Sequence, residues 1–237
     1  MSETRSPDIP LPSHTTMSAK LSITDKLHMP KCPAQIPRLG FGVYRSPATQ
    51  CVESCTTALK VGYRHIDTAQ LYGNEAQVGT AVRQSGLKRA DVFITTKILS
   101  AGGSFAKSLQ KCTDSVDKID GTEGYVDCFL VHSPKGGKEQ RKEMWQALEK
   151  LYETDKAKSI GVSNYGIGHI EEMKAYAKVW PPHVNQIEVS WFRPTRASPS
   201  VAQATDLPSS CTRGASKGRS SNTARKTRSS LRRIAHS

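Results

Sequence analysis

Residues 64–75, RHIDTAQLYGNE, begin like a β-strand and end like the first turn of a helix. The loop between the two carries Asp67 and Tyr72. Gly73 and Asn74 are turn-forming residues, and Asn74 is a favourable N-cap for the apolar-periodic run that follows. The stretch therefore holds a carboxylate and a phenol at the carboxyl end of a strand, where proteins built from β/α repeats carry out their chemistry. Taken alone, the pair also fits a simpler interpretation, in which Asp67 caps its own loop and Tyr72 is a half-buried aromatic residue.

Two further polar residues stand at the ends of later strand-like runs. Lys97 follows the run VFITT, and His132 follows the run YVDCFLV. A lysine and a histidine at such positions are not what an apolar core requires. We therefore expect Asp67, Tyr72, Lys97 and His132, which come from three successive strands, to converge on one point above a barrel.

The pattern of apolar and β-branched residues predicts alternating strands and helices. The strands are expected at residues 36–43, 63–67, 92–96, 125–131, 157–162 and 184–189, and the helices at residues 49–61, 74–85, 105–119, 138–153 and 167–178. This alternation is typical of parallel strands covered by helices. Right-handed crossovers would wind them into an incomplete (β/α)8 TIM barrel of about six β/α units.

A doubly wound open sheet is the alternative fold. Such sheets usually carry a glycine-rich fingerprint at their first turn. The candidate stretch GFGVY at residues 40–44 lacks both the third glycine and the start of a helix. The sequence therefore favours the partial barrel.

The basic character of the chain is concentrated at its C-terminus. The chain has 237 residues, a net charge of +13 and 36% hydrophobic side chains. Residues 193–237 hold ten basic side chains, one acidic side chain and ten serines, without an aromatic residue. Such a segment cannot bury enough apolar surface to offset its ordering entropy. We expect a disordered leader at residues 1–35, a folded domain at residues 36–192 and a disordered Ser/Arg-rich tail at residues 193–237.

The remaining composition bears on the cellular compartment. No apolar run approaches the ~20 residues of a membrane span, and residues 1–12 lack the apolar core of a secretory signal. The six cysteines are scattered, without a Cys-x-x-Cys pair. This usage argues against disulfide bonds and metal sites and indicates a reduced, cytoplasmic protein with no membrane partner.

Seven motifs resemble those of the aldo-keto reductase family in their order and spacing. They are LGFG (39–42), GYRHIDTA (62–69), YGNE (72–75), TTK (95–97), LVH (130–132), IGVSN (160–164) and VNQIE (184–188). The resemblance covers about residues 36–191. It implies a TIM-barrel oxidoreductase that uses NADPH, without a metal, to reduce a small aldehyde or ketone to an alcohol by hydride transfer. The preference for NADPH over NADH rests on this family analogy.

The resemblance also implies roles for the four polar residues. Tyr72 would be the general acid that protonates the developing alkoxide. A phenol of ordinary pKa ~10 is a poor acid at neutral pH, and the Lys97 ammonium beside it would lower its pKa. Asp67 would pair with Lys97 and fix its position. His132 would orient the substrate carbonyl and polarise it by a hydrogen bond.

Three more residues match the family positions that hold the nicotinamide carboxamide. These are Ser163, Asn164 and Gln186, and Asp67 completes the expected cofactor-binding set. On residue type alone, ordinary capping of strand ends explains Ser163, Asn164 and Gln186 equally well.

The sequence departs from the family pattern after Phe192. We find neither the last two strands, nor the loop that grips the adenosine 2′-phosphate, nor the loop that closes the substrate pocket. Six strands cannot close an eight-stranded barrel, so the first and sixth would present unpaired edges. We interpret the break as a shifted reading frame, a retained intron or a mispredicted gene, which reading the other frames downstream would test.

Two other functions remain open from the sequence. One is a catalytically inactive, truncated relative that keeps the four polar residues and cannot hold the cofactor. The other is polyanion binding through the basic tail. Because the tail has no aromatic side chain to stack on bases, such binding would be driven by phosphate contacts, and a solvated tail is favoured over a nucleic-acid partner. The sequence leaves the oligomeric state open.

Overall fold

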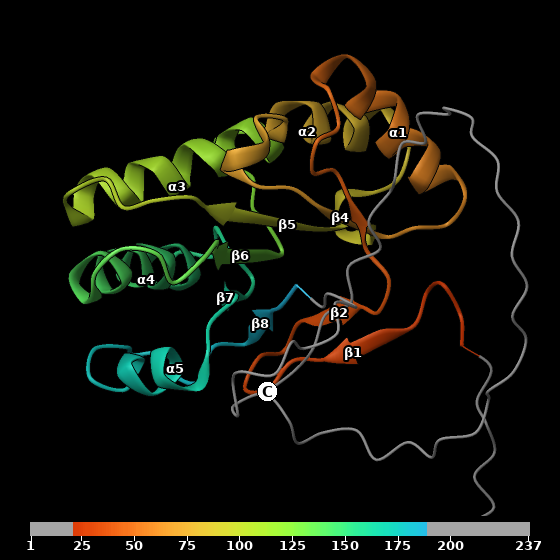
Figure 1. Ribbon diagram of the computed structural model, residues 1–237. Helices are drawn as coiled ribbons and strands as arrows, with labels where there is room; N and C mark the ends of the chain where they lie inside the picture. The colour runs from red at the N-terminus through yellow and green to blue at the C-terminus, as the bar shows by residue number, and fades with distance from the viewer. Residues whose placement is uncertain (1–20, 189–237) are drawn as a thin grey trace, which may run out of the picture.

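The computed structural model describes residues 21–188, so the expected C-terminal tail and most of the expected leader lie outside the described residues. Within this range the chain forms one curled parallel sheet with helices on its outer side (Figure 1). The sheet order β3-β4-β5-β6-β7-β8 follows the chain. The strands are β3 (Phe41–Gly42), β4 (His65–Asp67), β5 (Phe93–Ile98), β6 (Cys128–Val131), β7 (Ile160–Ser163) and β8 (Val184–Gln186).

Helices connect the strands and cover the outer face of the sheet. They are α1 (Ala48–Lys60), α2 (Glu75–Gln84), α3 (Phe105–Asp120), α4 (Lys138–Glu153) and α5 (Ile167–Met173), with 3-10 turns η1 (Gln70–Tyr72) and η2 (Arg89–Asp91). The prediction of an incomplete (β/α)8 barrel with about six strands is confirmed. The doubly wound alternative is wrong, because every strand pairs with its neighbour in sequence and the strand order never reverses.

The main core lies between the sheet and the helices. Apolar side chains at helical spacing face the sheet, as Cys112, Val116 and Ile119 do on α3. Close contact between α2 and α3 depends on Gly79, where an added Cβ would lie 2.1 Å from the Ile119 carbonyl oxygen. These contacts fix the helices against the sheet and so fix the strand ends.

The curl of the sheet brings distant strands together. In a flat sheet, β4 and β8 would lie about 19 Å apart, because four spacings of ~4.8 Å separate them. Nevertheless, Gln186 on β8 donates a hydrogen bond from Nε2 to Oδ2 of Asp67 on β4 at 2.8 Å. The carboxyl ends of the strands therefore surround a common interior.

A β-hairpin precedes the barrel strands and corrects two expectations. β1 (Lys26–His28) pairs antiparallel with β2 (Gln35–Pro37), and its apolar side chains pack against the inner face of the sheet. The ordered chain thus begins inside the segment expected to be a disordered leader. The single strand expected at residues 36–43 is instead two separate strands, β2 and β3. Pro37, which lacks an amide hydrogen, ends β2.

The other strands are shorter than, or shifted from, their expected ranges by a few residues. No helix within residues 21–188 is both long enough and apolar enough to cross a membrane.

Candidate active site

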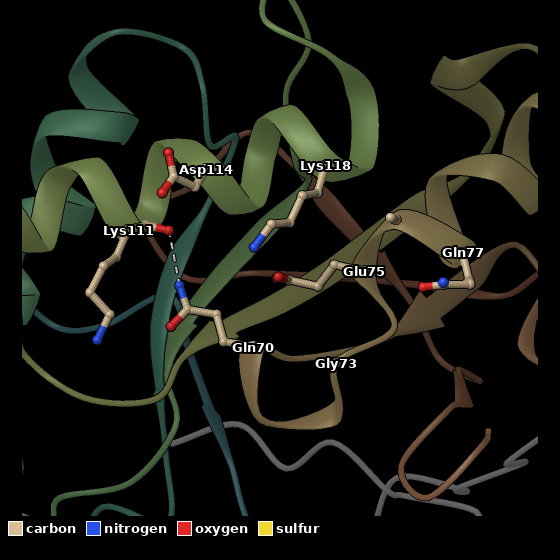
Figure 2. Close-up of a pocket in the computed structure, with 8 residues that line it drawn as sticks. Gln70, Gly73, Glu75, Gln77, Lys111, Asp114 and Lys118 are labelled. Atoms are coloured by element: carbon tan, nitrogen blue, oxygen red, sulfur yellow. Dashed lines mark hydrogen bonds between the residues drawn. The ribbon is translucent and has the colours of Figure 1, made fainter. Parts of the chain in front are cut away.

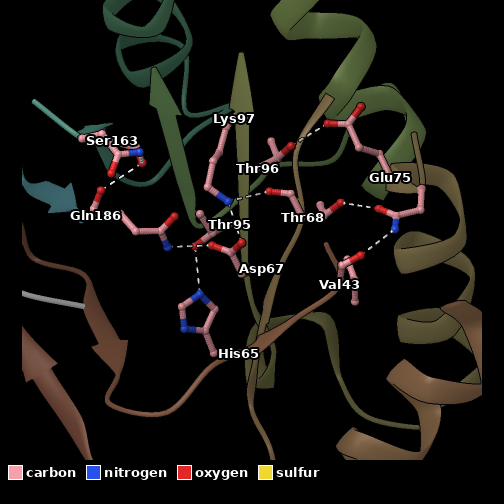
Figure 3. Close-up of polar contacts among 12 residues, drawn as sticks. Val43, His65, Asp67, Thr68, Glu75, Thr95, Thr96, Lys97, Ser163 and Gln186 are labelled. Atoms are coloured by element: carbon pink, nitrogen blue, oxygen red, sulfur yellow. Dashed lines mark hydrogen bonds and ion pairs between the residues drawn. The ribbon is translucent and has the colours of Figure 1, made fainter. Parts of the chain in front are cut away.

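A buried ion pair occupies the carboxyl ends of two adjacent strands. Lys97 on β5 places its Nζ 2.5 Å from Oδ1 of Asp67 on β4 and donates a second hydrogen bond, of 2.9 Å, to the carbonyl oxygen of Thr68 (Figure 3). The lysine is fully buried, and Asp67 is only 4% exposed. Burying an ammonium is costly unless it is paired and hydrogen-bonded, and here two oxygens meet that requirement.

The surroundings keep Asp67 ionised. Burial alone would raise the pKa of its carboxyl, but the Lys97 ammonium and the hydrogen bonds from Gln186 and Lys97 together hold the pKa below its ordinary value. The Asp67 carboxylate on β4 therefore accepts hydrogen bonds from Lys97 on β5 and from Gln186 on β8, and it links the three strands.

Tyr72 and His132 lie against this ion pair. Tyr72 ends η1, and Gly73 follows it in the left-handed conformation at φ 68°, a turn that glycine adopts without strain. The Nζ atom of Lys97 is 5.2 Å from the centroid of the Tyr72 ring. The His132 ring meets the Tyr72 ring edge-on, with centroids 5.7 Å apart and planes at 80°. The structure thus brings together all four residues that the sequence singled out.

Ser163 and Asn164 follow the end of β7 and contact the end of β8. The Ser163 hydroxyl and the backbone amide of Asn164 both donate to the backbone carbonyl oxygen of Gln186, at 2.9 and 2.8 Å. Asn164 adopts a left-handed φ of 59°, and its side chain bridges Ser163 and the amide of Glu188. These hydrogen bonds join the ends of β7 and β8. They agree with ordinary capping of strand ends, which the sequence left open as the alternative to cofactor binding.

Gln186 differs from Ser163 and Asn164 because one atom of its side-chain amide has no hydrogen-bond partner among the described residues. Its Nε2 is committed to Asp67, whereas its buried Oε1 has no hydrogen-bond partner among the described residues. An unpaired buried acceptor is costly, and such atoms in native proteins commonly have a ligand or water as partner. Gln186 can therefore accept one hydrogen bond from a bound molecule.

The sequence missed a second group of polar residues behind the four. Asn74 stands at the N-cap position of α2, as expected, but its side chain makes no capping hydrogen bond. Instead it bonds to the loops after β3 and β4, through Val43, Ser46 and Thr68. A residue type that commonly caps helices gives no sequence signal for this other use.

His65 was also missed, although it lies on the inner face of β4. Its Nε2 is 2.9 Å from the Thr95 hydroxyl. Burial, together with the Lys97 charge and against the opposing effect of Asp67, lowers the pKa of His65 to about 4. The imidazole is therefore neutral at pH 7.

A cavity of about 430 Å³ lies apart from the four residues, on the helix side of η1 and α2 (Figure 2). Glu75 forms part of its wall, and its carboxylate accepts from the Thr96 and Ser115 hydroxyls at 2.5 and 3.2 Å. Burial raises the pKa of Glu75, although these hydrogen bonds oppose the shift. Neither Tyr72 nor Lys97 lines this cavity, so it is separate from the ion pair.

The fold and site define a parallel β/α partial barrel with a buried Lys–Asp pair, a tyrosine and a histidine at its carboxyl edge. A model of the aldo/keto reductase family matches residues 38–229, and the chain belongs to that family. The match continues past Trp191, so the expectation that the resemblance ends there is wrong.

Individual relatives agree with the family match. Glyoxal reductase of Bacillus subtilis is 38% identical over 173 residues, which are 73% of this chain and 60% of the relative. The 9,11-endoperoxide prostaglandin H2 reductase of Trypanosoma cruzi is 40% identical over 156 residues, which are 65% of this chain and 53% of the relative. The chain thus spans between half and two thirds of the length of these curated relatives.

Solved structures give the same result. An aldo/keto reductase from Brucella melitensis superposes with a TM-score of 0.65 at 39% identity, covering 70% of this chain and 63% of that one. An aldo-keto reductase from Bombyx mori in complex with NADP superposes with a TM-score of 0.63 at 26% identity, covering 71% of this chain and 59% of that one.

Proposed function

We propose that this chain reduces aldehydes or ketones to alcohols with NADPH, and that Tyr72, Lys97, Asp67 and His132 are its catalytic residues. The observation that carries the proposal is the fully buried Lys97–Asp67 pair beside the Tyr72 ring. A lysine buried at the mouth of a barrel costs stability, and stabilising a phenolate gives it a chemical purpose.

Tyr72 supplies the proton. As hydride reaches the carbonyl carbon, negative charge grows on the carbonyl oxygen, and the Tyr72 hydroxyl transfers its proton there to give the alcohol. The Lys97 ammonium stabilises the phenolate that remains, and Asp67 holds that ammonium in place through its 2.5 Å contact. The phenolate regains its proton from solvent after the alcohol leaves.

His132 orients the substrate. Its ring stands edge-on to Tyr72, so a hydrogen bond from the imidazole could direct the carbonyl oxygen toward the phenol. Holding reacting atoms in line converts much of the entropic barrier into binding. The substrate class is small carbonyl compounds, and glyoxal is the first to try because one relative bears that name.

The cofactor proposal rests on Gln186. NADPH would supply the hydride, and its carboxamide group offers N–H donors that suit the unpaired Oε1 of Gln186. Ser163 and Asn164 lie at the end of the adjacent strand and would complete this binding edge. The reaction would take place in the cytoplasm, where thiols such as the five free cysteines of the described chain stay reduced.

The test is cofactor binding and turnover by the purified full chain. We expect NADPH fluorescence to titrate to saturation and NADPH absorbance to fall when glyoxal is added. The Tyr72→Phe variant should lose about 100-fold or more in kcat, the range for removal of a general acid, and keep its NADPH affinity.

Tyr176→Phe is the matched control, because it makes the same chemical change on a buried hydroxyl without a hydrogen-bond partner among the described residues. It should turn over like the wild type. Full activity of Tyr72→Phe would contradict the proposed mechanism. A folded chain that binds no NADPH would instead indicate the catalytically inactive relative.

A further inference from the structure

One buried side-chain amide joins three parts of the chain around the proposed site. Asn74 is 1% exposed. Its Nδ2 donates to the carbonyl oxygens of Val43 at 3.0 Å and Ser46 at 3.2 Å, in the segment that joins β3 to α1. Its Oδ1 accepts from the Thr68 hydroxyl at 2.8 Å, in the loop after β4. Asn74 itself directly precedes α2.

Because the Asn74 side chain makes these bonds, it does not cap α2. At an N-cap position the side-chain oxygen usually accepts from a backbone amide of the first helical turn and so stabilises the helix. The Asn74 side chain makes no such bond to α2. The helix therefore begins without its side-chain cap, and the amide is used to hold the loops together.

One of these loops positions the cation. The Thr68 hydroxyl donates to Asn74, and the Thr68 carbonyl oxygen accepts from Nζ of Lys97 at 2.9 Å. A shift of Thr68 would therefore move an oxygen that holds the ammonium together with the Asp67 carboxylate.

The other loop positions the phenol. Tyr44 lies between Val43 and Ser46, the two residues whose carbonyls Asn74 binds, and its ring centroid is 5.0 Å from that of Tyr72. Tyr72 is also only two residues before Asn74, across the Gly73 turn. Both the packing partner of the phenol and the turn that carries it are thus anchored at one amide.

We propose that Asn74 is a positioning residue of the reduction, which sets the distance between Tyr72 and Lys97 by holding the loops after β3 and β4 against the start of α2. This inference rests on the proposed function. An amide suits the task because it offers an acceptor and two donors from one planar group. A carboxylate could keep the bond from Thr68 but could not donate to Val43 and Ser46.

The decisive variant is Asn74→Asp. Its carboxylate can still accept from Thr68, or it can turn to cap α2, for which aspartate is among the best residues. The Val43 carbonyl keeps a partner in the amide of Ser46, at 3.0 Å. Because the carboxylate is buried and faces the Val43 and Ser46 carbonyl oxygens, we expect a lower melting temperature. The kinetics are therefore compared at a temperature at which both proteins are folded, where the KM for NADPH should be unchanged. In contrast, kcat should fall about 10- to 100-fold, because a displacement of ~1 Å can cost on the order of 100-fold in rate.

Three further variants separate positioning from other effects. Thr68→Val cuts the link from Asn74 to the loop after β4 without adding charge, and it should lower kcat in the same direction. Asn74→Ala combined with Thr68→Val should lose less than the product of the two single losses, because both remove the same link. Gln77→Ala, in the same first turn of α2, should leave kcat unchanged.

The possible results distinguish a failure of the positioning role of Asn74 from a failure of the proposed reductase function. Wild-type kcat in Asn74→Asp, or a kcat that falls only in step with the melting temperature, would overturn the positioning role while the proposed reductase function stands. Losses that multiply independently in the double variant would also overturn it. A wild-type chain without turnover would overturn the proposed function and this inference with it.

Discussion

The two faces of the one parallel sheet are built from opposite kinds of side chain. The outer face, which packs on the helices, is buried and mostly apolar, and Thr96, which donates to Glu75, is a polar exception. Its apolar members include Ile66, Ile94, Phe129, Val131, Ile160 and Val162. The inner face at the carboxyl end carries buried polar groups, namely Asp67, Thr95, Lys97, Ser163 and Gln186. Alternate residues of the same strands therefore serve packing and chemistry.

The inner face itself changes character along the strands. At the hairpin end it is apolar again, where Phe93, Cys128 and Val184 pack with Met29 and Ile36 of the hairpin. Apart from His65, which pairs in register with Phe93, these polar groups of the inner face lie at the edge at which the loops meet. The outer face and the hairpin end stabilise the fold, whereas the polar edge costs stability, and the proposed reaction would explain why it is retained.

The largest effect is expected from breaking the polar edge. Lys97→Met removes the cation and leaves the Asp67 carboxylate buried without its charged partner. Removing one member of a buried ion pair typically costs about 3–5 kcal/mol of stability, and loss of the cation should also abolish measurable turnover. Urea unfolding and NADPH oxidation check the two parts. Normal turnover by the Lys97→Met variant would show that the buried charge has no role in the chemistry.

An equally large stability loss on the outer face should leave the chemistry intact. Phe129→Ala opens a cavity at a fully buried position between the sheet and the helices. Truncating such a residue costs about 3–5 kcal/mol. At a temperature at which the variant is folded, kcat per folded molecule should equal that of the wild type. A fall in kcat as large as that of Lys97→Met would erase the distinction between the two faces.

A smaller, pH-dependent effect is expected from His65, the neutral imidazole of the inner face. Its pKa is lowered to about 4 in the folded chain, against ~6.5 when unfolded. Between these values the unfolded chain binds a proton that the folded chain does not, so stability falls as pH drops from about 6.5 toward 4. His65 should therefore contribute a loss of about 2 kcal/mol between pH 7 and pH 5.

Urea unfolding at both pH values, for the wild type and His65→Gln, measures this contribution as a difference. Other titrating groups, such as His183, whose burial also lowers its pKa, act alike in the two proteins and cancel. Parallel pH dependence of the two proteins would mean that His65 titrates in the folded chain as it does in the unfolded one.

The outer face could be predicted from the sequence better than the inner face. The spacing of apolar residues shows which side of a helix or strand packs in the core. Helix α4 has the expected bounds, Lys138–Glu153, since its apolar residues recur at helical spacing and face the core. The β1–β2 hairpin was missed because each of its strands is three residues long and leaves no readable alternation. Its position depends on contacts with the inner face of the sheet, which are distant in sequence.

The site was predictable only where its chemistry is unusual for the position. A lysine and a histidine at strand ends stand out, so Lys97 and His132 could be singled out with Asp67 and Tyr72. An asparagine directly before a helix is common, so Asn74 does not stand out in the sequence. Its hydrogen-bond partners lie up to 31 residues away in the chain. Supporting residues of this kind become visible only when the loops are folded together.

The fate of the transferred hydride tests the proposed reduction and the role of Tyr72 together. The full chain would be incubated with glyoxal and NADPH deuterated at its transferable position, and the alcohol product analysed by mass spectrometry beside that of Tyr72→Phe and Tyr176→Phe. We expect one deuterium per alcohol formed, at similar rates for the wild type and Tyr176→Phe and at a rate about 100-fold or more lower for Tyr72→Phe. Product without deuterium, or equal product from Tyr72→Phe, would contradict the proposal.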